Sequence, residues 1–426
     1  MKNKHLLAAV LLALLIAATT HAAGPPYVII DLGPLPVPGA SGAVIDRANH
    51  INNFGQVTGS FVIGGSYRGA YVYSNGAVKN LGSLPGGGSN AGFGINNLGQ
   101  VTGWAFPQNG YPNEHPFLYS GGIMQDLGLL PNSGYGDGYA INDAGQVTGQ
   151  SGHAFLASGG TMVDLGTLNG NPTFYSQGNG INASGQVTGW SDSPAGRRAI
   201  LSSSSPGSMS GLGTFGGDSS EGHGINDSGQ VTGWADLPGG GTYDKRHAFL
   251  RNTPGGTMGD LGTLPGDTFS HGNAINNPGQ VVGSSGTFVT AEHAFLYSGG
   301  TMYNLNSLAT NLATSGFHYL AVAYGINDQG WIVGQGIGGS SNAHAFLAIP
   351  TTPPEVRIVT GGSGFEVRWP ANANEWTLQT STTLATGSWT AVPGPFATDL
   401  GEFVYSFPHS EPRRFFRLFV ILVAGP

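Results

Sequence analysis

A turn that recurs along this sequence contains side chains that could bind calcium. The stretch "GINDSGQVTGW", residues 224–234, contains Asn-Asp-Ser-Gly, and carboxylate and amide oxygens in such a turn are calcium ligands. The aspartates of the recurring turn are Asp143, Asp227 and Asp328, whereas other copies hold Asn53, Asn97, Ala183 and Asn277. The further carboxylates of a calcium loop are also missing, so we expect a plain Asx–Gly hairpin turn.

Histidines form a second recurring set. The phrase "HAFL" begins at His153, His247, His293 and His344, with "HPFL" at His115, while Gly69 and Arg198 stand in the equivalent position elsewhere. If this position faced a central channel, the imidazoles could converge on a transition metal. We expect instead that each His packs at a strand start and is held by a neighbouring backbone group. We predict no metal site and no cofactor.

Carboxylates that could hydrolyse a glycosidic bond are the third candidate chemistry. Such a reaction needs two carboxyl groups, and Glu114 with Glu221 is one pair, although their spacing offers no support. The turn resembles the aspartate-box hairpin of sialidase propellers, which is structural, but the arginine cluster of a sialidase is not evident. No HExxH, Ser-His-Asp order or phosphate-binding glycine loop stands out. We predict no catalytic residues.

The elements that would position these side chains follow from the repeat itself. The turn recurs at intervals of about 40 to 50 residues, a period typical of propellers and solenoids. Each turn has an Asn, whose side chain can bond to the backbone two residues on, and a Gly for the positive-φ position. The Asn positions are Asn52, Asn96, Asn142, Asn182, Asn226, Asn276 and Asn327, and the Gly positions are Gly55, Gly99, Gly145, Gly185, Gly229, Gly279 and Gly330.

Four short strands fit into each repeat. One strand ends at the turn, "QVTGW" alternates as the second, "HAFLY" is the third and a "DLG" phrase ends the fourth. The Gly in "QVTGW" indicates a close backbone approach, which we attribute to sheets stacked on one another. Four strands per repeat is the content of one propeller blade. We therefore predict an all-β fold.

The two ends of the repeat region predict how the blades close. "YVIIDLG", Tyr27–Gly33, has no partner before it, and the last repeat ends at "HAFLAIP" with no "DLG" behind it. The N-terminal strand would complete the last blade. We predict a seven-bladed β-propeller over residues 27–350, closed by its N-terminal strand; an open solenoid would need capping repeats instead.

In these three phrases the chain resembles the bacterial extracellular repeat family named for its "HAF" motif. The resemblance covers residues 27–350 and implies a secreted, propeller-like protein with no established activity. "RAIL" at Arg198 and "GAYV" at Gly69 depart from the motif, and Trp331 replaces the Gln of the other turns.

Beyond a Pro-Thr linker, residues 351–426 alternate as several strands and predict a small β-sandwich-like module. "WTLQTSTTLATGSWTAV" followed by "RRFFRL" resembles a short C-terminal module appended to many secreted bacterial proteins.

The other end of the chain and its composition indicate the compartment. Residues 1–22 have a basic start, an apolar core and a small-residue exit, the pattern of a secretory signal peptide. There is no cysteine, and 15 Lys and Arg stand against 23 Asp and Glu, which argues against nucleic acid as a partner. We expect a secreted protein that is extracellular, periplasmic or attached to the cell surface. We also expect a monomer, with no membrane span in the mature chain.

The segments between "GQVTGW" and "HAFL" differ from repeat to repeat and would emerge on one face of the disc. Variable loops on a fixed scaffold commonly carry binding. We therefore predict a non-catalytic binding scaffold for a carbohydrate or protein ligand. A carbohydrate-active enzyme (a glycoside hydrolase or lyase) using carboxylates on that face, and a cell-surface structural protein, are the alternatives. The candidate ligand-binding residues are Tyr111, Glu114, Asp192, Arg197, Asp236, Tyr243, Arg246 and Glu292.

Overall fold

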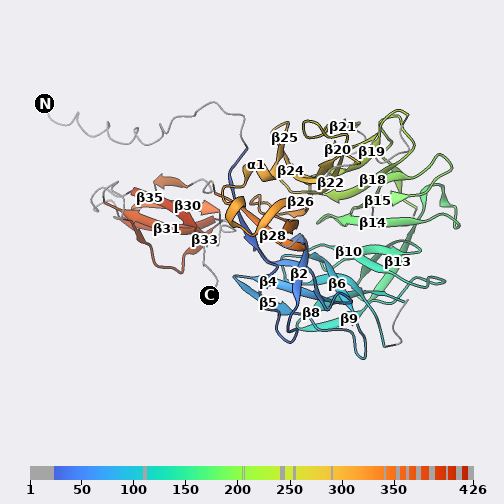
Figure 1. Ribbon diagram of the computed structural model, residues 1–426, viewed down its shortest axis with the longest axis horizontal. Helices are drawn as coiled ribbons and strands as arrows, with labels where there is room; N and C mark the ends of the chain where they lie inside the picture. Colours follow the sequence, from blue (N-terminus) through green and yellow to red (C-terminus); the bar gives the residue numbers. More distant parts are fainter. Residues whose placement is uncertain are drawn as a thin grey trace.

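The described part of the chain is built almost wholly of antiparallel β-sheets (Figure 1). The computed structural model describes residues 24–108, 113–203, 205, 207–239, 245–252, 256–288, 291–339, 342–351, 356–360, 364–370, 376–382, 389–399, 402–408 and 415–420. The expected signal peptide, residues 1–22, lies outside these ranges.

Seven four-stranded sheets follow one another along the chain, and we number them blades 1 to 7. Blade 1 consists of β2 (Val44–Ile51), β3 (Val57–Ile63), β4 (Tyr67–Ser74) and β5 (Ala77–Asn80). Blade 2 consists of β6 (Asn90–Ile95), β7 (Val101–Ala105), β8 (His115–Ser120) and β9 (Ile123–Asp126). Blade 3 consists of β10 (Asp137–Ile141), β11 (Val147–Ser151), β12 (His153–Ser158) and β13 (Thr161–Gly166). Blade 4 consists of β14 (Ser176–Ile181), β15 (Val187–Ser191), β16 (Arg198–Ser202) and β17 (Ser210–Gly211).

The remaining blades repeat the pattern up to the closure. Blade 5 consists of β18 (Ser220–Ile225), β19 (Val231–Asp236), β20 (Arg246–Arg251) and β21 (Met258–Asp260). Blade 6 consists of β22 (Phe269–Ile275), β23 (Val281–Gly286), β24 (His293–Ser298) and β25 (Thr301–Asn304). Blade 7 consists of β26 (Phe317–Ile326), β27 (Ile332–Gly338), β28 (Ala343–Pro350) and β1 (Tyr27–Asp31). Short helices among the described residues include η1 (Leu168–Gly170), α1 (Leu305–Leu308) and η3 (Leu312–Thr314).

The first strands of the blades form the inner wall of a closed ring. Each first strand contacts the first strand of the next blade, and β26 of blade 7 contacts β2 of blade 1. Figure 1 shows the blue first blade lying beside the orange last one. The predicted seven-bladed propeller is therefore confirmed, including blades 1 and 4, whose third strands depart from the "HAFL" phrase.

The N-terminal strand closes the ring as predicted. β1 pairs antiparallel with β28 in a register that sets Tyr27 opposite Pro350 and Asp31 opposite Phe346. The Tyr27 side chain is 1% exposed, and its hydroxyl donates a hydrogen bond to the carbonyl of Gly330 at 3.0 Å. The last blade is thus completed by residues some three hundred positions away in the chain.

The hydrophobic core lies between neighbouring blades. The Phe of the third strand has no exposed surface at Phe117, Phe155, Phe249, Phe295 or Phe346. Burying one such ring contributes roughly 1.5–3 kcal/mol. In blades 1 to 5 a Thr of the second strand is also fully buried, and its hydroxyl donates to a backbone carbonyl of the third strand, as Thr232 does to Phe249 at 2.7 Å.

The Gly of "QVTG" makes room for a carbonyl group of the adjacent strand in the same sheet. We had expected it to make room for a neighbouring sheet, and this expectation was wrong. A Cβ on Gly233 would lie 1.9 Å from the carbonyl oxygen of Glu221 on β18, the adjacent strand of the same blade. The register of the two strands shifts between Gly222 and Gly224, and this bulge pushes the carbonyl inward. The glycines of the first strand serve the contact between blades instead, since a Cβ on Gly224 would lie 3.1 Å from Ala274 of blade 6.

The C-terminal residues form two sheets, as predicted. One contains β29 (Arg357–Thr360), β30 (Gly364–Pro370), β34 (Glu402–Pro408) and β33 (Ala397–Asp399), and the other β32 (Thr390–Ala391), β31 (Trp376–Ser381) and β35 (Phe415–Val420). Val367 and Trp369 from the first sheet share a core with Leu378 from the second. Within the described residues, no helix has the length and apolar character needed to cross a membrane.

Candidate functional site

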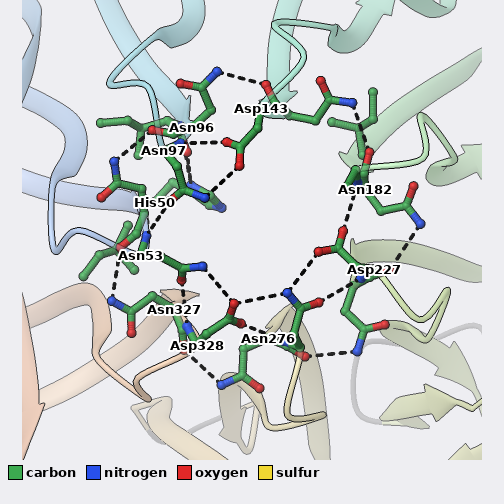
Figure 2. Close-up of a pocket in the computed structure, with 18 of the residues that line it drawn as sticks. His50, Asn53, Asn96, Asn97, Asp143, Asn182, Asp227, Asn276, Asn327 and Asp328 are labelled. Atoms are coloured by element: carbon green, nitrogen blue, oxygen red, sulfur yellow. Dashed lines mark hydrogen bonds between the residues drawn. The ribbon is translucent and has the colours of Figure 1, made fainter. Parts of the chain in front are cut away.

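The channel at the centre of the ring has two chemically different ends. Every first strand begins at one end and finishes at its Asn turn at the other. At the turn end, the Ile-Asn pair and the following residue of all seven blades line a cavity of about 160 Å³ (Figure 2). The variable segments lie at the opposite end, because β19 runs back from the turn and the Asp236 amide donates to the Ser219 carbonyl just before β18.

The repeated Asn joins each blade to the next. In all seven copies its Oδ1 accepts the backbone N–H four residues on, at 2.8–3.0 Å, which closes the turn. The expected bond from the N–H two residues on accompanies it at Asn52 and Asn96. Its Nδ2 donates to the backbone carbonyl of the corresponding Asn in the next blade, at 2.8–3.2 Å. The last bond runs from Asn327 to Asn52, so the circuit closes on itself, and we call it the Asn ring (Figure 2). These seven side chains are 3–6% exposed.

Asp would form the same Asx turn but has no N–H to donate. The occurrence of Asn, never Asp, at all seven positions was therefore a sequence signal for the Asn ring that our turn argument did not use. The Gly of each turn has φ between +71° and +83°, as such hairpins require.

The position after the Asn forms a second, incomplete circuit around the channel. The backbone N–H of Asn277 donates to Asp328 Oδ1, and the backbone N–H of Ala183 donates to Asp227 Oδ1, each at 2.9 Å. Ala183 has no side chain to accept from its neighbour, which interrupts the circuit beside Asp143. Asn side chains donate to the aspartates, and in the described residues no three His, Cys, Asp or Glu side chains are grouped closely enough to hold a metal ion.

His50 is the one histidine among the described residues that line the cavity at the turn end. The other six blades have Gly or Ala at this position of the first strand, whereas the His50 imidazole reaches into the cavity at the turn end. Its Nδ1 lies 3.2 Å from the carbonyl oxygen of Ile95 in blade 2. Burial lowers the pKa of His50, and the contact with the Ile95 carbonyl offsets only part of this effect.

The other end of the channel, which we call the mouth, opens into a pocket of about 240 Å³. All seven first strands contribute to it. Its lining residues are Asn49, Phe93, Tyr139, Gln177, Asn179, Glu221, His223, Asn273 and Tyr324. Seven of these occupy one equivalent position, three residues before the Asn of the turn. The residue at this position varies between blades, whereas the residues on both sides of it are Gly or Ala, with His50 as the exception.

Most polar side chains at this position are fixed by the neighbouring blade. Asn49, Asn179 and Asn273 each donate a hydrogen bond from Nδ2 to a carbonyl of the next blade, at 2.8–2.9 Å. His223 Nδ1 approaches the Gly272 carbonyl in the same way, at 3.1 Å. The mouth therefore combines variable chemistry with a fixed geometry.

Aromatic and acidic groups lie together where blades 2 and 3 meet. The rings of Phe93 and Tyr139 stack with centroids 5.4 Å apart, and the Tyr139 hydroxyl donates to Asp137 at 3.2 Å. Burial raises the pKa of Asp137, and the bond from Tyr139 opposes this shift. Burial together with the nearby Asp137 charge also raises the pKa of Glu114, while burial raises that of Tyr139.

Blades 4 and 5 contribute an ion-paired group to the mouth. The Arg197 guanidinium lies 3.6 Å from the centre of the Trp190 ring and donates to Glu221 at 2.6 Å. Burial alone would raise the pKa of Glu221, but His223 and Arg197 together lower it to about 2. Glu221 is thus a permanently charged, neutralised carboxylate, which makes it a poor partner for Glu114 in acid–base catalysis.

A similar arrangement recurs in blade 5. Arg246 lies 3.9 Å from the centre of the Trp234 ring, and its Nε lies 3.6 Å from Asp236. Trp234 also contacts His271, whose pKa is lowered to about 3 by burial and by the nearby His223 and Arg246 charges. The Asp236 side chain is almost fully buried, and burial raises its pKa against the effect of Arg246.

The structure places the described loop candidates around the mouth without bringing all of them together. Arg197 contacts Glu221 and lies 3.5 Å from Asp192, Glu114 adjoins Asp137, and Arg246 pairs with Asp236. Glu292 contributes to the electrostatic surroundings of Tyr324. Tyr111 and Tyr243 lie outside the described residues. The mouth residues of the first strands were not predicted, although their variability inside a regular phrase was the available signal.

The histidines of "HAFL" have a partner that we did not expect. His115, His153, His247 and His344 each place Nδ1 2.8–3.0 Å from the Asp of the "DLG" phrase in the fourth strand of the same blade. Our expectation of a backbone partner was therefore wrong for these four. For His293, whose blade holds Asn304 in place of the Asp, it remains a prediction. In blade 7 the partner is Asp31 of β1, so this pair also joins the two ends of the propeller.

Comparisons with known proteins add the fold alone. No family model and no curated protein matches the chain. The chain is similar in structure to YCF48 bound to a peptide, with 13% identity over 77% of this chain and 96% of the other and a TM-score of 0.46. It is also similar to TolB from Acinetobacter baumannii, with 10% identity over 72% of this chain and 65% of the other and a TM-score of 0.38. The Aleuria aurantia lectin is similar in structure with 9% identity over 72% of this chain and 95% of the lectin, and a TM-score of 0.29. The chain spans less than two thirds of TolB, and likenesses this weak carry no functional argument.

Proposed function

We propose that this chain is a secreted, non-catalytic binding scaffold of the HAF repeat type, which binds an extracellular carbohydrate or protein ligand at the mouth of its propeller. The observation that carries the proposal is the mouth itself. Seven first strands hold seven variable side chains at one equivalent position, and all seven line one pocket. Aromatic rings and polar side chains line this pocket together, and precisely placed polar groups are what orient a ligand in its site.

Other features support the same proposal. The secretory pattern of residues 1–22 and the phrases shared with the HAF family agree with an extracellular role. The Asn ring, the Gly bulges and the buried Phe side chains account for the best-repeated residues through assembly, which leaves the variable ones for recognition.

A matched pair of substitutions tests the proposal. Asn179→Trp places an indole in the mouth, and Ser228→Trp places the same group at an exposed turn tip on the opposite face. The mature chain and both variants would be screened against an array of extracellular polysaccharides, glycans and secreted proteins. We expect Asn179→Trp to lose the ligand of the wild-type chain and Ser228→Trp to retain it. Equal binding by both variants would place the ligand elsewhere and refute the proposal.

One observation favours a second candidate, a carbohydrate-active enzyme. Glu114 and Asp137, the second of which accepts a hydrogen bond from the mouth residue Tyr139, are carboxyl groups with raised pKa values, and a general acid needs such a shift. Hydrolysis or lysis of an oligosaccharide by the wild-type chain, lost in Glu114→Gln, would establish this function in place of pure binding.

A further inference from the structure

The lining of the mouth carries little net charge. Glu221 is the only carboxylate among the nine lining residues, and no Lys or Arg is among them. Its charge is balanced by Arg197 at 2.6 Å. Arg47 stands behind the lining, over the ring of Tyr324 at 4.8 Å. A charged ligand group would lose hydration here, and no lining residue offers it an unpaired opposite charge, which disfavours ionic ligands.

The amides of the mouth are prepared for a ligand that both donates and accepts hydrogen bonds. Each of Asn49, Asn179 and Asn273 uses one N–H for the next blade, and an amide has a second N–H and an oxygen. Among the described residues, the side-chain oxygens of Asn49 and Asn273 have no hydrogen-bond partner. Since the bonds between blades fix their orientation, little side-chain entropy is lost when they bind hydroxyl groups.

Aromatic rings supply the apolar part of the site. The Phe93–Tyr139 stack belongs to blades 2 and 3 and the ring of Tyr324 to blade 7, and all three line the pocket. A sugar ring has C–H faces that pack on aromatic rings and hydroxyls around its edge that match amides. This combination of lining groups fits a pyranose better than an apolar or ionic side chain.

The size and depth of the pocket limit how much of a glycan can enter. Its volume of about 240 Å³ is below the usual range for drug-sized ligands, roughly 300–1,000 Å³. His50 follows Asn49 on the same strand and lines the separate cavity at the turn end, so the two pockets have different lining residues. The pocket therefore admits the end of a chain rather than its middle.

We infer that the mouth is a subsite for one uncharged terminal sugar unit of an extracellular glycan. The inference rests on the proposed binding function and adds the ligand class. The mouth selects the end group.

Paired glycans test the inference. The mature full chain would be titrated with oligosaccharides ending in glucose, galactose or N-acetylglucosamine, and with the same oligosaccharides capped by sialic acid. We expect at least one uncapped glycan to bind, and its capped form to bind at least tenfold more weakly. If no glycan binds, or if the capped form binds equally or better, the inference is wrong.

Two mouth variants and one control localise the effect. Asn273→Asp and Asn49→Asp introduce a carboxylate at the mouth, whereas Ser184→Asp adds the same charge at an exposed turn tip on the opposite face. We expect at least a tenfold loss of affinity for either mouth variant and a change within twofold for Ser184→Asp, with thermal melting confirming that each is folded. A folded mouth variant that binds like the wild type overturns the inference.

The Trp variants separate this inference from the proposed function. Suppose the wild-type chain binds a protein or an internal glycan segment, and Asn179→Trp abolishes that binding while Ser228→Trp does not. The mouth is then a binding site for another class of ligand, so only the inference fails. If binding survives Asn179→Trp, both fail.

Discussion

The Asn ring can be tested by removing its donors while leaving the turn intact, with the substitution Asn226→Asp. A carboxylate at this position still accepts the amide of Gln230, which Asn226 Oδ1 now accepts at 3.0 Å. It cannot donate to Gln230 Oε1 at 2.7 Å or to the Asn276 carbonyl at 3.0 Å, and it brings a negative charge next to both oxygens.

The expected cost follows from the burial of the site. Asn226 is 4% exposed, so the lost bonds are not replaced by water. Two hydrogen bonds contribute roughly 0.5–1.5 kcal/mol each, and a buried acceptor left unpaired costs about 1–3 kcal/mol more. We expect the free energy of unfolding to fall by about 2–6 kcal/mol, a large share of the roughly 5–15 kcal/mol typical of a folded domain.

Denaturant unfolding followed by near-ultraviolet circular dichroism would measure the change. Asn132→Asp is the matched control, because Asn132 is exposed and lies outside the Asn ring, and we expect its effect to stay within about 0.5 kcal/mol. If Asn226→Asp is no more destabilising than this control, the bonds between blades do not hold the ring together and the reasoning fails.

Three further changes probe the bulge, the mouth and the closure. Gly233→Ala would force a Cβ to within 1.9 Å of the Glu221 carbonyl and should prevent folding or lower the melting temperature by many degrees, whereas Gly88→Ala, with open space around it, should not change it; equal effects would contradict the bulge argument. The pKa of Glu221 is lowered from 4.5 to about 2, so its charged form stabilises the fold fully above pH 4.5, and this contribution disappears as the pH falls toward 2. Glu221→Gln should therefore cost up to about 3 kcal/mol at pH 7 and little at pH 2, which unfolding at both pH values would measure; a pH-independent difference would show that Arg197 does not stabilise the carboxylate. Removal of residues 24–31 strips β1 from β28, so the truncated chain should melt at a lower temperature with less cooperativity, and an unchanged melting curve would mean that the closure adds no stability.

Much of the fold could be read from the sequence because its signals are local. The Asn and Gly of each turn, the alternation of "QVTG" and the third-strand phrase act within a few residues of each other. Counting "DLG" phrases against turns then required Tyr27–Gly33 to supply the missing outer strand, since an unpaired edge in a closed ring has no other partner.

Only the tertiary structure decided where side chains meet across blades. The bond from Asn327 to Asn52, the pairing of His344 with Asp31 and the contact of Arg197 with Glu221 join residues far apart in the chain. Such contacts depend on the curvature of the whole ring, which sets how near each first strand comes to the next. For the same reason, the sequence shows that the mouth residues vary from repeat to repeat but not that they line one pocket. Only the closed ring brings them together.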